Sequence, residues 1–122
     1  MDQNHETLNL FEHDKVLWCG DLNYRLNSEN FEEIIEMIQN NKLFELRKLD
    51  QLRLERDAGN VFGDFEEGKI NFQPTYKFKV GTHEYDDEKK RTPSWCDRIL
   101  YRGEQISQVF YTSVGSVTIS DH

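Results

Sequence analysis

The stretch Trp18-Cys19-Gly20-Asp21-Leu22-Asn23-Tyr24-Arg25 decides how this 122-residue chain is interpreted. It continues an apolar run, and an apolar run that ends at a glycine predicts a short buried strand stopping at Gly20. Asp21 and Asn23 follow, two residues apart, and an extended backbone would put their side chains on one face. A carboxylate can deprotonate a water and a neutral amide can donate to a phosphoryl oxygen, so the pair suits phosphate ester hydrolysis.

Taken in isolation, the same residues also fit an Asx turn, in which Asp21 or Asn23 caps backbone amides and has no chemical role. Three further stretches favour the catalytic interpretation: Phe72-Gln73-Pro74-Thr75-Tyr76-Lys77-Phe78, Arg91-Thr92-Pro93-Ser94-Trp95-Cys96-Asp97-Arg98-Ile99-Leu100 and Ser120-Asp121-His122. Together and in this order, the four stretches resemble the signature of the inositol polyphosphate 5-phosphatases. That family is a branch of the endonuclease/exonuclease/phosphatase superfamily.

The resemblance implies an α/β fold, a fragment of a four-layered α/β sandwich whose mixed, largely antiparallel sheets pack face to face under helices. Catalytic domains of the family are much longer than this chain. Their upstream motifs include a glutamate that holds the metal and a histidine that contacts the scissile phosphate, and neither has a counterpart before Asp21. We therefore expect residues 1–122 to form the C-terminal part of such a catalytic domain, with its N-terminal part absent.

The resemblance also implies catalytic roles. Asp21 would activate the attacking water, and Asn23 would orient the transferred phosphoryl group. His122 would donate to a non-bridging oxygen in the transition state, with Asp97 holding its imidazole in place. Asp121 would help to hold the metal or the water, and the implied cofactor is Mg²⁺.

Asp97 has a competing interpretation, because it precedes a half-buried strand and a buried carboxylate needs a partner. A structural salt bridge to Arg98 or Arg102 would satisfy it as well as His122 would.

The resemblance implies that a second group of residues binds the phosphate next to the one removed, which is the 4-phosphate of an inositol ring. This group consists of Tyr76, Lys77, Lys89 and Arg91. A solvated charge run is the alternative for these cations, and it is the better interpretation of Lys90.

The charge distribution favours a small phosphorylated ligand. The net charge is -8, yet residues 69–102 carry 8 Lys/Arg against 5 Asp/Glu, whereas residues 1–68 carry 7 against 16. A local basic block in an acidic chain suits an inositol phosphate or a phosphoinositide head group, and it argues against nucleic acid, which needs a wider positive surface.

Cysteine content and hydropathy predict a cytoplasmic protein. Cys19 and Cys96 show no spacing typical of a metal site or a disulfide framework, so we expect reduced, packed thiols. No apolar run approaches the ~20 residues that a transmembrane segment requires. Any contact with a membrane surface would therefore be peripheral.

Local patterns predict the remaining elements. Ser28 or Asn30 would cap a helix whose apolar face is Phe31, Ile34, Ile35 and Ile38, and a second helix would carry Leu43, Leu46, Leu49 and Leu52 inward and end at Gly59. Glu66 and Glu67 are predicted to be solvated or to cap a turn. Strands are predicted at 95–101, 109–112 and 117–119. Solvated positions are predicted for three histidines: His5, His13 and His83.

Three functions remain open at this point. The first is a 5-phosphatase acting on inositol polyphosphates or phosphoinositides. The second is another enzyme of the superfamily, of the nuclease or sphingomyelinase type. The third is a non-catalytic remnant that binds phosphoinositides or a partner protein through the basic loops.

Overall fold

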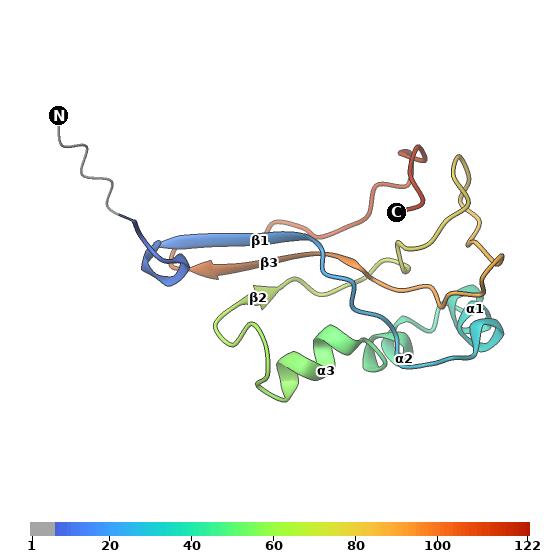
Figure 1. The fold of residues 1–122 in the computed structure, drawn as a ribbon, viewed down its shortest axis with the longest axis horizontal. Helices are drawn as coiled ribbons and strands as arrows, with labels where there is room; N and C mark the ends of the chain where they lie inside the picture. The colour runs from blue at the N-terminus through green and yellow to red at the C-terminus, as the bar shows by residue number, and fades with distance from the viewer. Residues whose placement is uncertain (1–6) are drawn as a thin grey trace.

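A computed structural model describes residues 7–122 of the chain, which fold into one elongated α/β unit (Figure 1). A narrow antiparallel sheet runs along the molecule, and three short helices lie on one side of it, the first of them beyond the end of the strands. A 3₁₀ turn, η1 (Leu10–Glu12), precedes the first strand. No helix in this part of the chain has the length and apolar character needed to cross a bilayer.

The sheet has three strands in the order β1-β3-β2, and all of its pairs are antiparallel. β1 (Lys15–Asp21) pairs with β3 (Asp97–Gly103), which pairs in turn with β2 (Glu66–Glu67). The β1–β3 register sets Asp21 directly opposite Asp97. Strand pairing therefore brings together two carboxylates that lie far apart in the sequence.

The predicted first helix is confirmed as α1 (Phe31–Gln39), with Asn30 as its N-cap. The Asn30 side chain accepts a hydrogen bond from the amide of Glu33, which satisfies one of the unpaired N–H groups at the helix start. Ile34 and Ile38 are buried, as the apolar spacing predicts.

The predicted single second helix is wrong, because the structure divides it into α2 (Leu43–Lys48) and α3 (Gln51–Asp57). Asp50 lies at the break, and its carboxylate accepts a hydrogen bond from the amide of Arg53. An N-cap aspartate starts a new helix, so one side chain ends the apolar repeat and redirects the chain. The glycine cap is confirmed, since Gly59 adopts a φ of 76°.

The core forms in two clusters, one among the helices and loops and the other between the sheet and α3. One surrounds Trp95, which is fully buried and donates its indole N–H to the carbonyl of Phe72 at 3.0 Å. The other surrounds Leu52 and Leu100. Near it, the rings of Trp18, Phe62 and Phe65 pack edge to face at 5.4–6.3 Å, and this packing anchors the loop before β2.

The prediction that β1 is a buried strand ending at Gly20 is wrong. The strand continues to Asp21, and among its residues only Val16 is buried. Side chains alternate across a strand, so Val16 faces the helices while Leu17, 69% exposed, points the other way. We call the side of the sheet that carries Leu17, Cys19 and Ile99 the open face, because no described helix or strand covers it.

The last two predicted strands are also wrong. Residues 106–114 and 117–118 contain no helix, strand or turn, and Val109, Phe110 and Ile119 are more than three-quarters exposed. β-branched and aromatic residues favour a strand only where they pair with a neighbouring strand, and this segment forms no such pair. Here the segment instead follows an irregular course that returns to the sheet at its final residues (Figure 1).

Candidate active site

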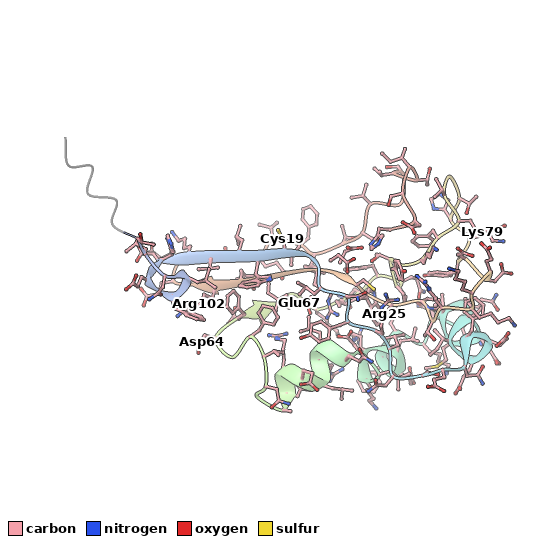
Figure 2. All side chains as sticks on the ribbon, in the orientation of Figure 1. Cys19, Arg25, Asp64, Glu67, Lys79 and Arg102 are labelled. Atoms are coloured by element: carbon pink, nitrogen blue, oxygen red, sulfur yellow. The ribbon has the colours of Figure 1, made fainter. Side chains whose placement is uncertain are left out.

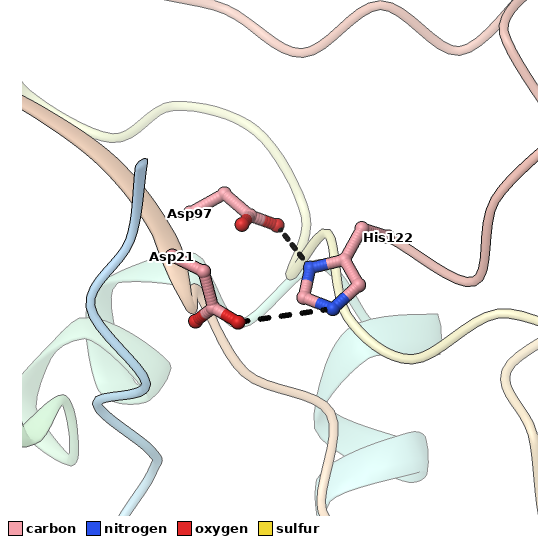
Figure 3. A group of neighbouring side chains, drawn as sticks. All are labelled: Asp21, Asp97 and His122. Atoms are coloured by element: carbon pink, nitrogen blue, oxygen red, sulfur yellow. Dashed lines mark hydrogen bonds and ion pairs between the residues drawn. The ribbon is translucent and has the colours of Figure 1, made fainter. Parts of the chain in front are cut away.

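Asp21, Asp97 and His122 meet at one end of the sheet (Figure 3). A hydrogen bond of 2.6 Å joins His122 Nδ1 to Asp97 Oδ2, and His122 Nε2 lies 3.9 Å from Asp21 Oδ2. The imidazole is thus held from one side by a carboxylate and presents its other nitrogen toward a second one. All three side chains are partly exposed, so a ligand has access to the group.

Backbone contacts bring the last residues into place. The amide of Phe78 donates to the carbonyl of Asp121 at 2.7 Å, and the amide of Gly81 donates to that of Thr118 at 2.6 Å. The C-terminal segment is therefore fixed to the 76–85 loop. His122 reaches the site through these contacts, since the segment that carries it forms no strand with the sheet.

The competing interpretation of Asp97 does not hold. Arg98 forms its ion pairs with Asp50 and Glu67, at 2.8 and 2.7 Å. Arg102 lies over the ring of Phe11, 4.8 Å from its centroid. The predicted hydrogen bond between Asp97 and His122 is confirmed.

Tyr76 forms the next layer of the site. Its ring centroid lies 4.7 Å from that of His122, and its hydroxyl accepts a hydrogen bond from Arg91 at 3.2 Å. The guanidinium of Arg25 lies over the same ring, 4.6 Å from the centroid. Two of the predicted substrate residues, Tyr76 and Arg91, thus border the Asp21–His122 group. Arg25 is the last residue of the Trp18–Arg25 stretch, and the sequence predicts no role for it.

Asn23 forms an Asx turn with Asp21, and this turn is also part of the candidate active site. Its φ is 61°, so the premise of an extended segment with Asp21 and Asn23 on one face is wrong. The amide of Asn23 donates to Asp21 Oδ1 at 2.9 Å, which is the Asx turn that was the alternative. Its side-chain oxygen accepts from Arg25 at 2.6 Å. Asn23 therefore meets the site through Arg25, and the turn leaves Asp21 Oδ2 free to face His122.

The other predicted site residues lie farther out. Lys77 Nζ lies 3.4 Å from Asp86 and 3.8 Å from Asp121, so the Asp121 carboxylate faces a lysine. The structure does not group Asp121 with the carboxylates that could hold a metal. Lys89 is exposed and points to no described partner, and Lys90 pairs with Glu32 on the surface.

Sequence reasoning missed a buried ion cluster behind the site. Arg98 donates to both oxygens of Asp50 and to both oxygens of Glu67 at 2.7–2.9 Å, and its side chain is 2% exposed. The expectation that Glu67 is solvated or caps a turn is therefore wrong. Burial opposes the charge on Arg98, but the hydrogen bonds to Glu67 and Asp50 outweigh it and raise the pKa of the guanidinium. No local signal could have revealed this cluster, because its members come from three separate segments.

Tyr111 links the ion cluster to the C-terminal segment. Its hydroxyl accepts from the amide of Ile99 at 3.0 Å and donates to Glu67 at 3.1 Å. Burial, followed by the charge on Glu67, raises the pKa of Tyr111 to about 12. The hydroxyl therefore stays protonated and keeps its donated hydrogen bond at neutral pH.

The donor set at the site fits a divalent cation. Ligand atoms of Asp21, Asp97 and His122 all lie within 4.8 Å of one another, and within residues 7–122 this is the one such group of three. Carboxylate oxygens suit Mg²⁺, which is commonly held by one or two carboxylates together with substrate phosphate. A hollow of about 570 Å³ adjoins the group and is lined by Phe78, Asp97 and His122.

The two cysteines differ, and both are free thiols. The prediction of packed thiols is confirmed for Cys96, which is buried, and is wrong for Cys19, which lies exposed on the open face. His13 and His83 are exposed, as predicted, whereas His5 lies outside the described residues.

Comparison with known proteins gives a consistent family assignment. The model of Endonuclease/Exonuclease/phosphatase family 2 matches residues 2–122. Type I inositol polyphosphate 5-phosphatase 8 of Arabidopsis thaliana is 42% identical over 99% of this chain and 26% of its own length. The Type II inositol 1,4,5-trisphosphate 5-phosphatase of Mus musculus is 39% identical over 100% of this chain and 12% of its own length. The chain thus spans about a quarter or less of these relatives.

Solved structures agree with the sequence comparison. The inositol polyphosphate 5-phosphatase domain of SPsynaptojanin, crystallised with inositol (1,4)-bisphosphate and a calcium ion, superposes with a TM-score of 0.90 at 44% identity. The match covers 97% of this chain and 34% of that one. The Cimex nitrophorin ferrous NO complex also matches, with a TM-score of 0.77 at 32% identity over 89% of this chain and 39% of that one. The predicted fold class is confirmed, and the fold alone does not select an activity.

Proposed function

Because the chain belongs to Endonuclease/Exonuclease/phosphatase family 2, we propose that it carries part of the active site of a phosphatase that removes the 5-phosphate from inositol polyphosphates or phosphoinositides. The observation that carries this proposal is the position of His122 between two carboxylates, 2.6 Å from Asp97 and 3.9 Å from Asp21. The inositol polyphosphate 5-phosphatases among its relatives support the substrate class.

Asp21 is proposed to orient and deprotonate the attacking water. Its Oδ1 is occupied by the amide of Asn23, so Oδ2 is the oxygen that remains available for a proton. A carboxylate in hydrogen-bond reach of a water can act as general base, and such catalysis typically contributes about 10²–10⁴-fold. The Asx turn fixes this carboxylate before substrate arrives.

His122 is proposed to donate its Nε2 proton to a phosphoryl oxygen. The Asp97 carboxylate accepts the hydrogen bond from Nδ1 and holds the ring orientation, so the form that can also donate from Nε2 is the doubly protonated imidazolium, whose charge Asp97 offsets. The Tyr76 ring packs against the imidazole and limits its rotation. A donor fixed in advance stabilises the transition-state charge without reorganising during the reaction.

The proposed cofactor is Mg²⁺, and the atoms of this chain that fit it are carboxylate oxygens of Asp21 and Asp97. The position of Asp121 against Lys77 does not favour the metal role predicted for it. When bound, the ion would polarise a phosphoryl oxygen and offset the negative charge that the carboxylates bring near the phosphate.

Tyr76, Lys77, Lys89 and Arg91 are proposed to bind the neighbouring 4-phosphate. The contact between Tyr76 and Arg91 supports this role, because it places a guanidinium next to the ring that packs on His122. Asn23 keeps a role near the transferred phosphate through its bond to Arg25. The substrate class further implies a cytoplasmic enzyme that contacts phosphoinositide membranes peripherally.

Phosphate release from inositol 1,4,5-trisphosphate with Mg²⁺ tests the proposal in the protein that contains this chain. We expect inositol 1,4-bisphosphate as the product and a loss of at least about 100-fold in turnover for Asp21→Ala. Asp14→Ala, which removes an exposed carboxylate on the loop before β1, is the matched control and should retain activity. Full turnover of Asp21→Ala, or release of the 1- or 4-phosphate, would refute the assignment. Binding to phosphoinositide vesicles with no phosphate release would instead favour a non-catalytic binding protein.

A further inference from the structure

A second pocket lies on the helix side of the sheet, away from Asp21 and His122. It has a volume of about 360 Å³ and is bounded by α2, α3 and the chain that follows β2. The buried Arg98 cluster forms part of its lining, and Figure 2 shows Glu67 between β3 and α3. Pockets of this size bind small molecules.

The pocket carries more positive than negative charge. Its lining includes five cations and three carboxylates, although the chain as a whole has a net charge of -8. Two of those carboxylates, Asp50 and Glu67, already bind Arg98 with both oxygens. The third, Asp57, is exposed and lies 3.7 Å from Arg53.

Three of the lining cations have no carboxylate within 4.0 Å among residues 7–122: Arg47, Arg56 and Lys69. Two of them are held in position by the backbone. Arg47 Nη1 donates to the carbonyl of Ile70 at 2.8 Å, and Arg56 Nη2 donates to that of Phe65 at 2.9 Å. Each guanidinium has further N–H donors, and Arg56 Nε is buried without a partner.

A phosphate group fits this combination of features. Guanidinium groups match phosphate oxygens in geometry, and anchoring them beforehand lowers the entropy cost of binding. Solvated surface cations would be mobile and separately hydrated, whereas Arg47 and Arg56 are fixed at the rim of a single hollow. We propose that this pocket binds a phosphate-bearing anion through Arg47, Arg56 and Lys69.

This site is separate from the catalytic group. Successive side chains of a strand point to opposite faces, so Arg98 faces the pocket while Asp97 faces His122. No residue is shared between the lining of the pocket and the Asp21–Asp97–His122 group. The proposal therefore does not depend on the proposed phosphatase activity, and either can fail without the other.

The phosphate could come from a free metabolite or from a lipid head group, and the experiment distinguishes these sources. The whole chain, labelled with ¹⁵N, is titrated in one arm with inorganic pyrophosphate. In the other arm it is mixed with vesicles of phosphatidylcholine containing phosphatidic acid. Amide shifts of Gly68, Lys69 and Ile70 report the pocket, and those of Asp21 and Asn23 report the catalytic end.

Lys69→Gln is the test variant, because Lys69 is exposed and the described contacts give it no role in folding. Lys42→Gln is the control, since it removes the same charge from an exposed position outside the pocket. We expect saturable shifts at residues 68–70 in at least one arm, and about tenfold weaker binding for Lys69→Gln with little change for Lys42→Gln. Shifts confined to the catalytic end, no saturable binding in either arm, or equal weakening by both variants would overturn the proposal.

Discussion

Asp97 and Arg98 are adjacent on β3 and point to opposite faces of the sheet. The Asp97 carboxylate accepts a hydrogen bond from His122 on the open face. The Arg98 guanidinium binds Asp50 and Glu67 on the opposite face, which faces the helices. The buried cluster thus fixes the strand segment from which the Asp97 carboxylate projects. Its rigidity bears on the site because an error of about 1 Å in placing a catalytic group can cost about 100-fold in rate.

Asp97 and His122 are expected to act as one unit in catalysis. Asp97→Asn should lower kcat by at least about 100-fold, because the neutral amide removes the negative charge that stabilises the protonated imidazole and can turn its NH₂ group toward Nδ1. Adding Asp97→Asn to His122→Ala should then cost little more than His122→Ala alone, since both substitutions disable the same donor. Steady-state kinetics of the two single variants and the double variant measure this. If the loss of kcat in the double variant equals the product of the losses in the two single variants, the hydrogen bond has no role in turnover.

Arg98 is expected to contribute strongly to stability. Arg98→Leu leaves the Asp50 and Glu67 carboxylates buried without their partner, and breaking a buried pair in this way costs about 3–5 kcal/mol. Arg53→Ala, which removes an exposed ion pair with Asp57, should cost less than about 1 kcal/mol. Urea denaturation gives both free energies of unfolding. Similar values for the two variants would contradict the role assigned to the cluster.

The two cysteines should differ in reactivity. Burial raises the pKa of the Cys96 thiol to about 11 from an ordinary value of 9.0, while Cys19 is exposed. At pH 8 this shift lowers the thiolate fraction of Cys96 about 100-fold, and its burial blocks access as well. Iodoacetamide followed by peptide mass spectrometry should find Cys19 labelled and Cys96 unlabelled, with both labelled in denaturant. Equal labelling in the folded protein would contradict the burial of Cys96.

The same pKa shift predicts how stability changes with pH. The folded state holds the Cys96 proton more tightly than the unfolded state, so this contribution is present below pH 9.0 and is lost as the pH rises toward about 11. In Cys96→Ala, the free energy of unfolding should no longer fall by this contribution as the pH rises. Urea denaturation of both proteins at pH 8 and pH 10.5 measures the difference, and parallel declines would exclude Cys96 as its source.

Metal removal is expected to abolish phosphate release while leaving the fold intact. The carboxylates of the site meet at the surface, and neither of the two core clusters includes them. EDTA should therefore stop turnover, Mg²⁺ should restore it, and the circular dichroism spectrum should not change. Undiminished release in EDTA would rule out the proposed cofactor.

Arg91 is expected to affect substrate affinity more than turnover. Arg91→Ala should raise KM about tenfold for a substrate with a 4-phosphate, because one charge-assisted contact is lost. For an analogue lacking that phosphate, KM should stay the same. Lys90→Ala is the matched control, since Lys90 pairs with Glu32 on the surface. An equal effect on both substrates would assign Arg91 a structural role through Tyr76.

From the sequence alone, the family and the local elements that depend on nearby residues could be predicted. The four motifs indicated the family, and the Asn30 cap and the spacing of Ile34 and Ile38 predicted α1 correctly. These features could be predicted because capping and helical periodicity act over a few residues. The Asp97–His122 hydrogen bond could be expected only through the resemblance, since no local rule joins residues so far apart.

Tertiary structure alone decided the features that require distant segments to meet. Glu67 is predicted to be solvated, but in the structure it pairs with the buried Arg98. Residues 109–112 and 117–119 have the composition of strands but form none, because they do not pair with the sheet. The anion pocket likewise depends on which carboxylates Arg98 neutralises and which cations remain without partners. Side-chain chemistry can be read along the chain, but whether a charge is paired, buried or free depends on the neighbours that folding supplies.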